Sequence, residues 1–320
     1  MTPKDRYSRC IVVAAAVPAM LVACATSNSE TMVDETDAYS WLFPEPTGVE
    51  AQLIANAPAS PLEPLSDFGP QVSDALAEAY QAAAGYDEAG RVAEAAQVGG
   101  YAMRLAAKQG ETLSLLQVER LVTVRALAVA DGGDPDLAAE LYDLRVDVIA
   151  DENDWESRLP PGIEVRREYD EQLAYVMRSM AHRDRALMNG ARPGHAVEML
   201  ADLERAVLFS VAVGRPDAVR IQRVVISNVI GTQQFEGALA AVETRLDEIS
   251  DNQESIVEEV FIAILRVGAV SAVNLDDLPR ALEYYQLILE GAEMSGYTDP
   301  LLENDRRAAK LIQEELRRRG

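Results

Sequence analysis

Residues 254–281, ESIVEEVFIAILRVGAVSAVNLDDLPRA, carry the pattern from which the fold class follows. Apolar residues recur there at intervals of three and four, the spacing of one helix face: Val260, Ile264, Val267 and Val270. Residues 112–130 repeat this spacing with Leu113, Leu116 and Leu121. No run alternates apolar and polar residues well enough to predict a strand. From Gln71 onward, the sequence therefore predicts an all-α fold.

Glycine and proline separate the predicted helices. Gly132-Gly133-Asp134-Pro135 ends one helix and begins the next, with Asp134 as N-cap and Pro135 in the first turn. Pro160-Pro161-Gly162 is the strongest break in the chain. Further boundaries are predicted at Gly190–Gly194, Gly214–Pro216, Asp299-Pro300 and Arg317–Arg319. We expect about ten or eleven helices, most of them roughly 14–22 residues long, joined as antiparallel hairpins.

A weak repeat accompanies these helices. Three segments place an aromatic residue or leucine three residues before an alanine: Gly85–Ala89, Phe235–Ala238 and Leu278–Ala281. Pro193-Gly194-His195-Ala196 occupies the equivalent place in another hairpin. Ala196 precedes Ala238 by 42 residues, and Ala238 precedes Ala281 by 43.

These segments resemble the turn and second helix of tetratricopeptide-type repeats, in which a small residue lets paired helices approach closely. The resemblance covers residues 164–295 and implies an α-solenoid of stacked hairpins. A bulky residue should follow four positions later, where Leu200, Val242 and Tyr285 lie. This sequence departs from the family in two ways. The period is longer than the usual 34 residues. Positions where the family has a small residue are large or charged here, namely Asp184, Ile226, Arg245 and Ile288, whereas Ala269 fits. An unrelated helical bundle is the alternative.

The first residues have the layout of a secretory signal. Lys4, Arg6 and Arg9 precede an apolar run, Ile11–Val22, that only Pro18 interrupts. This run is too short to span a bilayer, which requires about 20 residues. We therefore predict a signal peptide over residues 1–23.

Leu21-Val22-Ala23-Cys24, directly after the apolar run, resembles the lipobox of bacterial lipoproteins at all four positions. The resemblance implies that the Cys24 thiol carries a diacylglycerol, that the signal is cleaved before Cys24, and that the new amine takes a further acyl chain such as palmitate. Ala25, in place of aspartate, implies the outer membrane, facing the periplasm, if the cell has two membranes. Ordinary cleavage after Ala23-Cys24-Ala25, followed by simple secretion, is the alternative.

Residues 24–70 differ in composition from the rest of the chain. Residues 25–70 contain eight acidic residues, six prolines and no lysine or arginine, so we predict an extended acidic tether between the lipid and a helical-repeat domain at 71–320. Trp41-Leu42-Phe43 interrupts this composition. We expect it to dock on the folded domain rather than to recognise a partner. Residues 49–56 could add a helical turn or two on the same surface.

Composition excludes several classes of function. The chain has 53 acidic and 29 basic residues, a net charge of −24, which argues against nucleic-acid binding. Two cysteines and two histidines, His182 and His195, offer no metal-ligand spacing. Phosphate-binding glycine loops and nucleophile-elbow motifs are absent from the sequence. We therefore predict no metal, no cofactor and no enzymatic activity.

Arginines gather at Arg178, Arg183 and Arg185, and again at Arg215, Arg220 and Arg223. The simpler interpretation is that they form salt bridges between neighbouring helices, because several carboxylates lie nearby in the sequence: Asp184, Glu198, Asp202 and Glu204. The first cluster is nevertheless the first candidate for binding a polar ligand.

The sequence thus predicts a lipid-anchored, non-catalytic scaffold that binds envelope proteins through a helical-repeat groove. One alternative is a small-molecule-binding accessory lipoprotein of a transporter, and a less favoured one is an envelope glycan hydrolase. Exposed aromatic residues in a groove would favour the scaffold. An enclosed pore would favour the transporter accessory, and two facing buried acids would favour the hydrolase.

Overall fold

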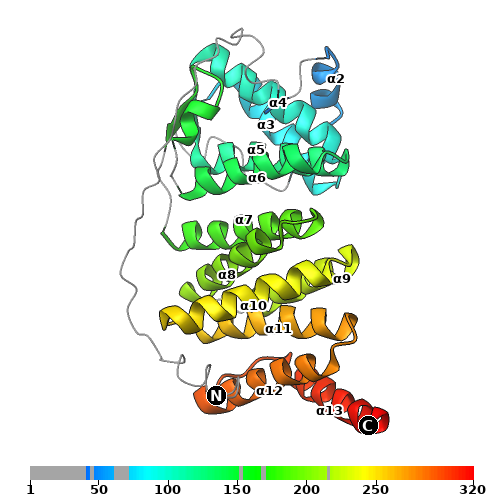
Figure 1. Ribbon diagram of the computed structural model, residues 1–320. Helices are drawn as coiled ribbons and strands as arrows, with labels where there is room; N and C mark the ends of the chain where they lie inside the picture. The colour runs from blue at the N-terminus through cyan, green and yellow to red at the C-terminus, as the bar shows by residue number, and fades with distance from the viewer. Residues whose placement is uncertain (1–40, 44–46, 61–71, 151–153, 167–170, 215–216) are drawn as a thin grey trace, which may run out of the picture. The chain divides into compact units, whose positions relative to one another are not determined.

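The structure is a computed structural model that describes residues 41–43, 47–60, 72–150, 154–166, 171–214 and 217–320. These residues form twelve α-helices and little sheet, which confirms the all-α prediction (Figure 1). The chain divides into two compact units, an amino-terminal unit at Ala25–Ala174 and a carboxy-terminal unit at Tyr175–Gly320. Each unit is described separately below.

The amino-terminal unit is built from successive helices that pack on one another: α2 (Glu50–Ala55), α3 (Asp74–Glu88), α4 (Val92–Gln109), α5 (Leu115–Asp131) and α6 (Pro135–Ala150). The predicted turn at residues 132–135 is confirmed, because the Asp134 carboxylate accepts a hydrogen bond from the backbone N–H of Leu137 (3.1 Å). A capping box at Ser114 and Gln117 starts α5.

The same unit contains a pair of short parallel strands, β1 (Thr112–Ser114) and β2 (Glu164–Arg166), and a 3₁₀ turn, η2 (Trp155–Arg158). The sequence predicted no strand, since three residues are too few for an alternating pattern. Leu113, expected within a helix over 112–130, lies in β1 instead. The predicted break at 160–162 is confirmed between η2 and β2. Gly162 has a φ of +94°, and a Cβ there would lie 2.7 Å from the Ala107 carbonyl oxygen.

The segment Trp41-Leu42-Phe43 packs on this unit, as predicted. The side chains of Leu42 and Phe43 are completely buried. The Arg125 guanidinium donates to the carbonyl of Leu42 (3.1 Å), and that of Arg104 donates to the carbonyl of Phe43 (3.3 Å). Burial of two apolar side chains stabilises this attachment by a few kcal/mol, at about 1.5–3 kcal/mol each.

A second attachment follows at α2, which confirms the helical turns expected over 49–56. Its Glu50 carboxylate accepts hydrogen bonds from the backbone N–H groups of Thr47 (2.7 Å) and Gly48 (2.9 Å) and from the Gln97 amide on α4 (2.5 Å). Burial raises the pKa of Glu50, but these hydrogen bonds outweigh it and lower the pKa to about 2. Residues 41–43 and the segment around α2, which the sequence places within the tether over 24–70, therefore pack on the amino-terminal unit.

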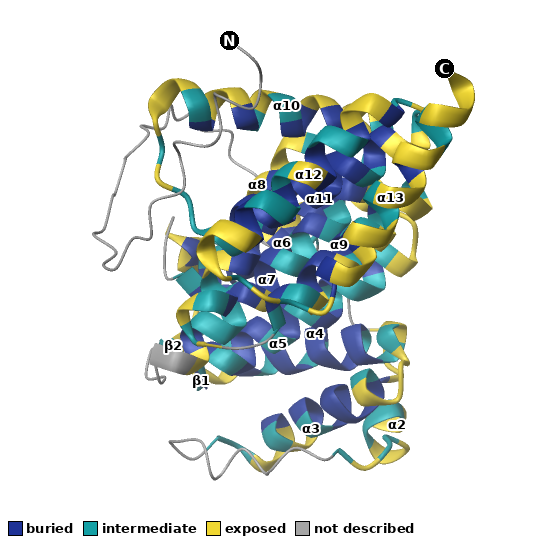
Figure 2. Ribbon diagram, turned by 90° about the horizontal axis from the view of Figure 1, so that it is seen from below, coloured by how far each residue is buried: buried dark blue, intermediate teal, exposed yellow. Residues whose placement is uncertain are grey.

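The carboxy-terminal unit begins within α7 (Glu171–Ala191) and continues through six more helices. They are α8 (Ala196–Ala212), α9 (Asp217–Thr232), α10 (Phe235–Asn252), α11 (Glu258–Asn274), α12 (Leu278–Ser295) and α13 (Leu302–Arg319). Helix α11 contacts α8, α9, α10 and α12, so it is the central helix of this unit. Buried residues fill the middle of α11, whereas many residues of α13 are exposed (Figure 2).

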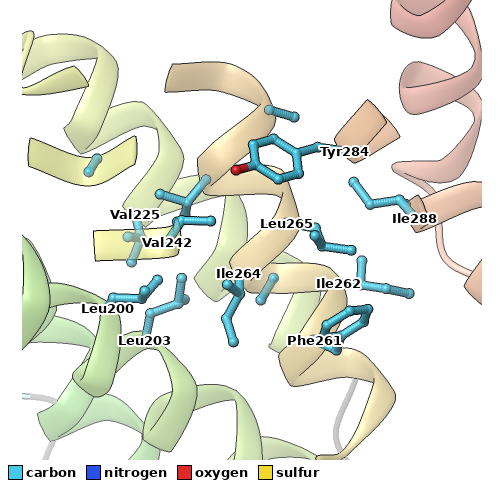
Figure 3. Close-up of a cluster of buried hydrophobic side chains, with 14 of the residues drawn as sticks. Leu200, Leu203, Val225, Val242, Phe261, Ile262, Ile264, Leu265, Tyr284 and Ile288 are labelled. Atoms are coloured by element: carbon cyan, nitrogen blue, oxygen red, sulfur yellow. The ribbon is translucent and has the colours of Figure 1, made fainter. Parts of the chain in front are cut away.

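The core of this unit surrounds α11 (Figure 3). Ile264 and Leu265 are fully buried beside Leu203 on α8 and Val242 on α10. The sequence predicted one apolar face for this helix, but every residue from Val260 to Ala269 is buried. The closest approach is at Gly268, where an added Cβ would lie 2.8 Å from a methyl carbon of Val242.

The structure tests the repeat segment by segment. Phe235–Ala238 and Leu278–Ala281 begin α10 and α12, and Ala196 begins α8, as the pattern predicts. The bulky positions are buried: Leu200, Val242 and Tyr285. Gly85–Ala89 is a correction, because it ends α3 instead of starting a helix. Its Tyr86 hydroxyl donates to the carbonyl of Leu53 (2.8 Å) and so holds the segment around α2.

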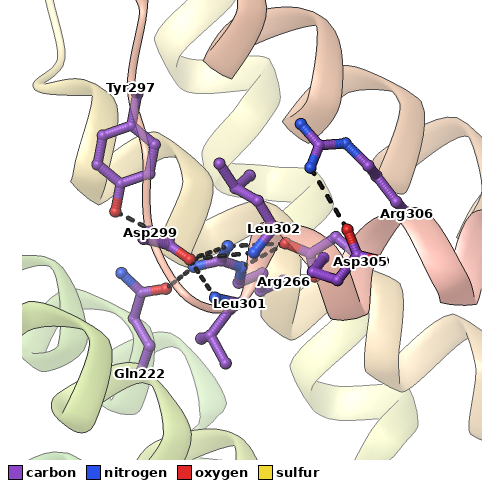
Figure 4. A network of polar contacts seen from close by, with 9 residues as sticks. Gln222, Arg266, Tyr297, Asp299, Leu301, Leu302, Asp305 and Arg306 are labelled. Carbon is purple, nitrogen blue, oxygen red and sulfur yellow. Dashed lines mark hydrogen bonds and ion pairs between the residues drawn. The ribbon is translucent and has the colours of Figure 1, made fainter.

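One buried arginine joins three parts of the carboxy-terminal unit (Figure 4). Arg266 on α11 donates to Gln222 on α9 (2.6 Å), to Asp299 before α13 (2.7 and 3.1 Å) and to Asp305 on α13 (3.0 and 2.7 Å). The Tyr297 hydroxyl also donates to Asp299 (2.9 Å). Burial raises the pKa of Asp299, but bonding to Arg266 outweighs it and the pKa is lowered.

Candidate functional site

A groove of about 460 Å³ lies between α8 and α10 of the carboxy-terminal unit. Its walls and floor are mainly apolar and come from α8, α10, the segment before α11 and the first turn of α11: Val197, Leu200, Ala201, Leu208, Ala241, Ile256, Val257 and Val260. On α8 the lining residues recur at three- and four-residue intervals, so they form one face of that helix.

Two apolar side chains on this face are unusually exposed. Val197 is 61% exposed and Leu208 is 40% exposed, at opposite ends of α8. Between them, Leu200 and Val260 are buried in the floor of the groove. An apolar groove with an apolar rim presents area that a partner segment can remove from water.

Arg245 on α10 supplies the charged part of the groove. It donates to both oxygens of Glu204 on α8 (2.9 and 3.1 Å) and to both oxygens of Glu254 (2.8 Å each). Bonding to Arg245 lowers the pKa of Glu254, whereas burial raises that of Glu204. Arg245 is one of the positions where the repeat pattern calls for a small residue. Its side chain joins α10 to α8 through Glu204, and this departure is the sequence signal that could have located the groove.

The structure gives the three predicted ligand arginines different partners. Arg185 binds the buried Asp202 carboxylate through both Nε (2.9 Å) and Nη2 (2.7 Å), which confirms the salt-bridge interpretation at that position. Arg183 pairs with its neighbour Asp184. Arg178 lies over the Phe209 ring, 5.8 Å from its centre.

Asp202 also accepts from the Asn189 amide (3.1 Å) and lies 2.9 Å from His182 Nδ1. His182, Arg185 and Asn189 all belong to α7, so this carboxylate joins α7 to α8. Since Arg185 already neutralises Asp202, a neutral imidazole donating from Nδ1 completes the network.

In the second arginine cluster, Arg215 lies outside the described residues. Arg220 and Arg223 are exposed on α9 and line a hollow of about 750 Å³ together with Tyr297 and Pro300. Neither guanidinium forms an ion pair with a described residue. Cys24 and its lipobox also lie outside the described ranges.

Two of the discriminating features, exposed aromatic residues and facing buried acids, can be checked within the described ranges, together with possible metal clusters. The large exposed apolar side chains are aliphatic residues or methionine, not aromatic. Asp299 and Asp305 are facing buried acids, but both bind Arg266. No group of three or more histidine, cysteine or acidic side chains is arranged to hold a metal there.

Comparisons with known proteins add no relative, since no family model, curated protein or solved structure matches the chain. None of the helices in the described ranges combines the length and apolarity needed to cross a membrane.

The buried histidine gives a direct test of the Asp202 network. Burial lowers the pKa of His182, and the Asp202 hydrogen bond offsets this only in part. We therefore expect Asp202→Asn to lower it further. Because the folded-state pKa lies below the unfolded one, the folded protein loses stability as pH falls through about 6.5. Imidazole NMR titration can follow this, with His195→Gln assigning the two signals. A His182 pKa that is unchanged or higher in Asp202→Asn would contradict the network.

Proposed function

We propose that this chain is a lipid-anchored, non-catalytic adaptor of the cell envelope that binds a segment of a partner protein. The observation that carries the proposal is the groove between α8 and α10, with an apolar floor and exposed Val197 and Leu208 on its rim. Arg245 and its two glutamates provide polar contacts at one side, where a partner can be oriented.

The packing of the carboxy-terminal unit supports a tetratricopeptide-like α-solenoid. Helix α8 contacts α10, and α9 contacts α11, so equivalent helices of successive hairpins pack on each other. A solenoid requires such stacking of neighbouring repeats and exposes extended surfaces to partners. The longer period and the charged Arg245 distinguish these repeats from the usual pattern.

The anchor in this proposal is the lipid on Cys24. Sixteen residues lie between Cys24 and Trp41, the first described residue of the segment that packs on the amino-terminal unit. Even fully extended, this length of chain spans at most about 60 Å. Two or three acyl chains, at about 0.8 kcal/mol per buried methylene, would hold the protein on a membrane essentially permanently. Ala25 favours the outer membrane, facing the periplasm, in a cell with two membranes.

The anchor is tested by metabolic labelling with radioactive palmitate. The wild-type chain should incorporate label and sediment with membranes, and Cys24→Ala should do neither, because the acyl acceptor is the Cys24 thiol. A Ser27→Ala variant, three residues away, serves as the matched control and should label normally. Labelling that persists in Cys24→Ala would refute lipidation at this position.

The groove is tested by site-specific photo-crosslinking in cells. A photoreactive residue at Val197 or Leu208 should yield a defined crosslinked product with an envelope protein. The control is the same residue at Met294 on α12, which is 63% exposed but outside the groove. Leu208→Glu should weaken binding about tenfold or more, because it places a charge on the apolar rim. Equal products at Met294, or none at either groove position, would contradict the proposal.

A further inference from the structure

The two helices that wall the α8–α10 groove run parallel. At their starts, an added Cβ at Gly237 on α10 would lie 3.5 Å from the Cβ of Ala196 on α8. Further along both helices, Arg245 joins Glu204 (2.9 Å). Side chains on parallel helices form ridges at three- and four-residue intervals, and the groove between two helices can receive the ridge of a third helix.

The length of the groove sets the length of its occupant. The residues of α8 that line it run from Val197 to Leu208 on one face of the helix. Eleven residues separate these two positions along the chain numbering, which corresponds to about 16 Å along the helix axis. A partner helix of about three turns therefore covers the groove from one exposed apolar side chain to the other.

A helix suits these walls better than an extended peptide does. The described part of the carboxy-terminal unit contains no strand, so the groove offers no sheet edge with which an extended peptide could pair. Its floor is apolar, with Leu200 and Val260 buried. An extended backbone on that floor would leave its polar groups unpaired, whereas a helix satisfies them internally.

Charge within the groove lining is mainly negative. Arg245 faces three carboxylates, which are Glu204 and Glu254 in close contact and Glu248 at 3.5 Å. Burial, together with repulsion from Glu254 and Glu248, raises the pKa of Glu204 despite its bonds to Arg245. Arg205 is the other basic residue of the lining. Three carboxylates thus stand against two guanidinium groups.

The rest of both walls adds to this negative charge. Helix α10 carries five carboxylates and one arginine, and α8 carries three carboxylates and one arginine. Other helices neutralise two of these acids, since Arg185 pairs with Asp202 and Arg280 pairs with Glu243. The acids that remain still outnumber the two arginines. A positively charged segment is therefore attracted to the groove, and an acidic segment is repelled.

We infer that the groove binds an amphipathic α-helix about three turns long that carries lysine or arginine beside its apolar face. Apolar residues of this helix at positions i, i+3 or i+4 and i+7 cover Val197, Leu200 and Leu208. A basic side chain pairs with Glu248, whose own side chain is 54% exposed. This inference rests on the proposed adaptor function and describes the partner of that function by its chemistry.

The test is a selection from a displayed library of random peptides of about 16 residues, with the full chain in detergent as bait. We expect the enriched peptides to share apolar residues at i, i+3 or i+4 and i+7 and to carry a net positive charge. Binding of the best peptide, measured by fluorescence anisotropy, should weaken between about 50 mM and about 500 mM sodium chloride, because salt screens exposed charges.

Two charge reversals localise the effect. Glu248→Lys should raise the Kd of the best peptide about fivefold, because it sets like charges against each other in the groove. It should fold normally, since the Glu248 side chain is exposed. Glu293→Lys, at an exposed position of α12 outside the groove, changes the net charge equally and should alter the Kd less than about twofold.

Four results would overturn the inference: no enriched peptide, enriched peptides of neutral or negative charge, enriched peptides without the helical spacing, or equal effects of the two reversals. These failures are distinguishable from a failure of the adaptor function. An envelope protein crosslinked at Val197, found together with any of the four results, would refute only the chemistry of the partner.

Discussion

Arg266 lies in the interior of the carboxy-terminal unit, where a guanidinium without partners would strongly destabilise the fold. Its charge is tolerated because Gln222, Asp299 and Asp305 surround it with acceptors. These acceptors come from α9, from the loop before α13 and from α13 itself, so the burial of one side chain on α11 fixes three other segments. The surfaces formed by those segments, including the hollow beside Arg220 and Arg223, therefore depend on this network.

Three arginines of the carboxy-terminal unit differ in exposure, and their roles in the structure differ accordingly. Arg266 is buried and joins helices tightly. Arg245 is partly exposed, and it joins α10 to α8 through Glu204 at the groove. Arg220 is exposed and has no partner among the described residues. The strongly acidic composition supplies the carboxylates that bind Arg266 and Arg245.

Local sequence features predicted the helices and their boundaries well. Asp134 and Pro135 specify a helix start by themselves, and Leu42 and Phe43 are too apolar to remain in water. The strands were missed because three residues carry no period, and Gly85–Ala89 was misplaced because its spacing occurs equally at a helix end. Of the arginines, Arg185 could be matched to Asp202 from nearby sequence. Arg266 and Arg245 could not, because their roles depend on segments brought together only by folding.

The central claim is that Arg266 holds α9 and α13 on α11. Amide hydrogen exchange of the full chain, comparing Arg266→Met with Arg306→Met, tests it most directly. Arg306 is an exposed residue of α13 whose partner is Glu303. We expect Arg266→Met to lower the free energy of opening in α9, α11 and α13 by about 3–5 kcal/mol, and Arg306→Met by less than about 1 kcal/mol. Equal and small effects of the two substitutions would contradict the account.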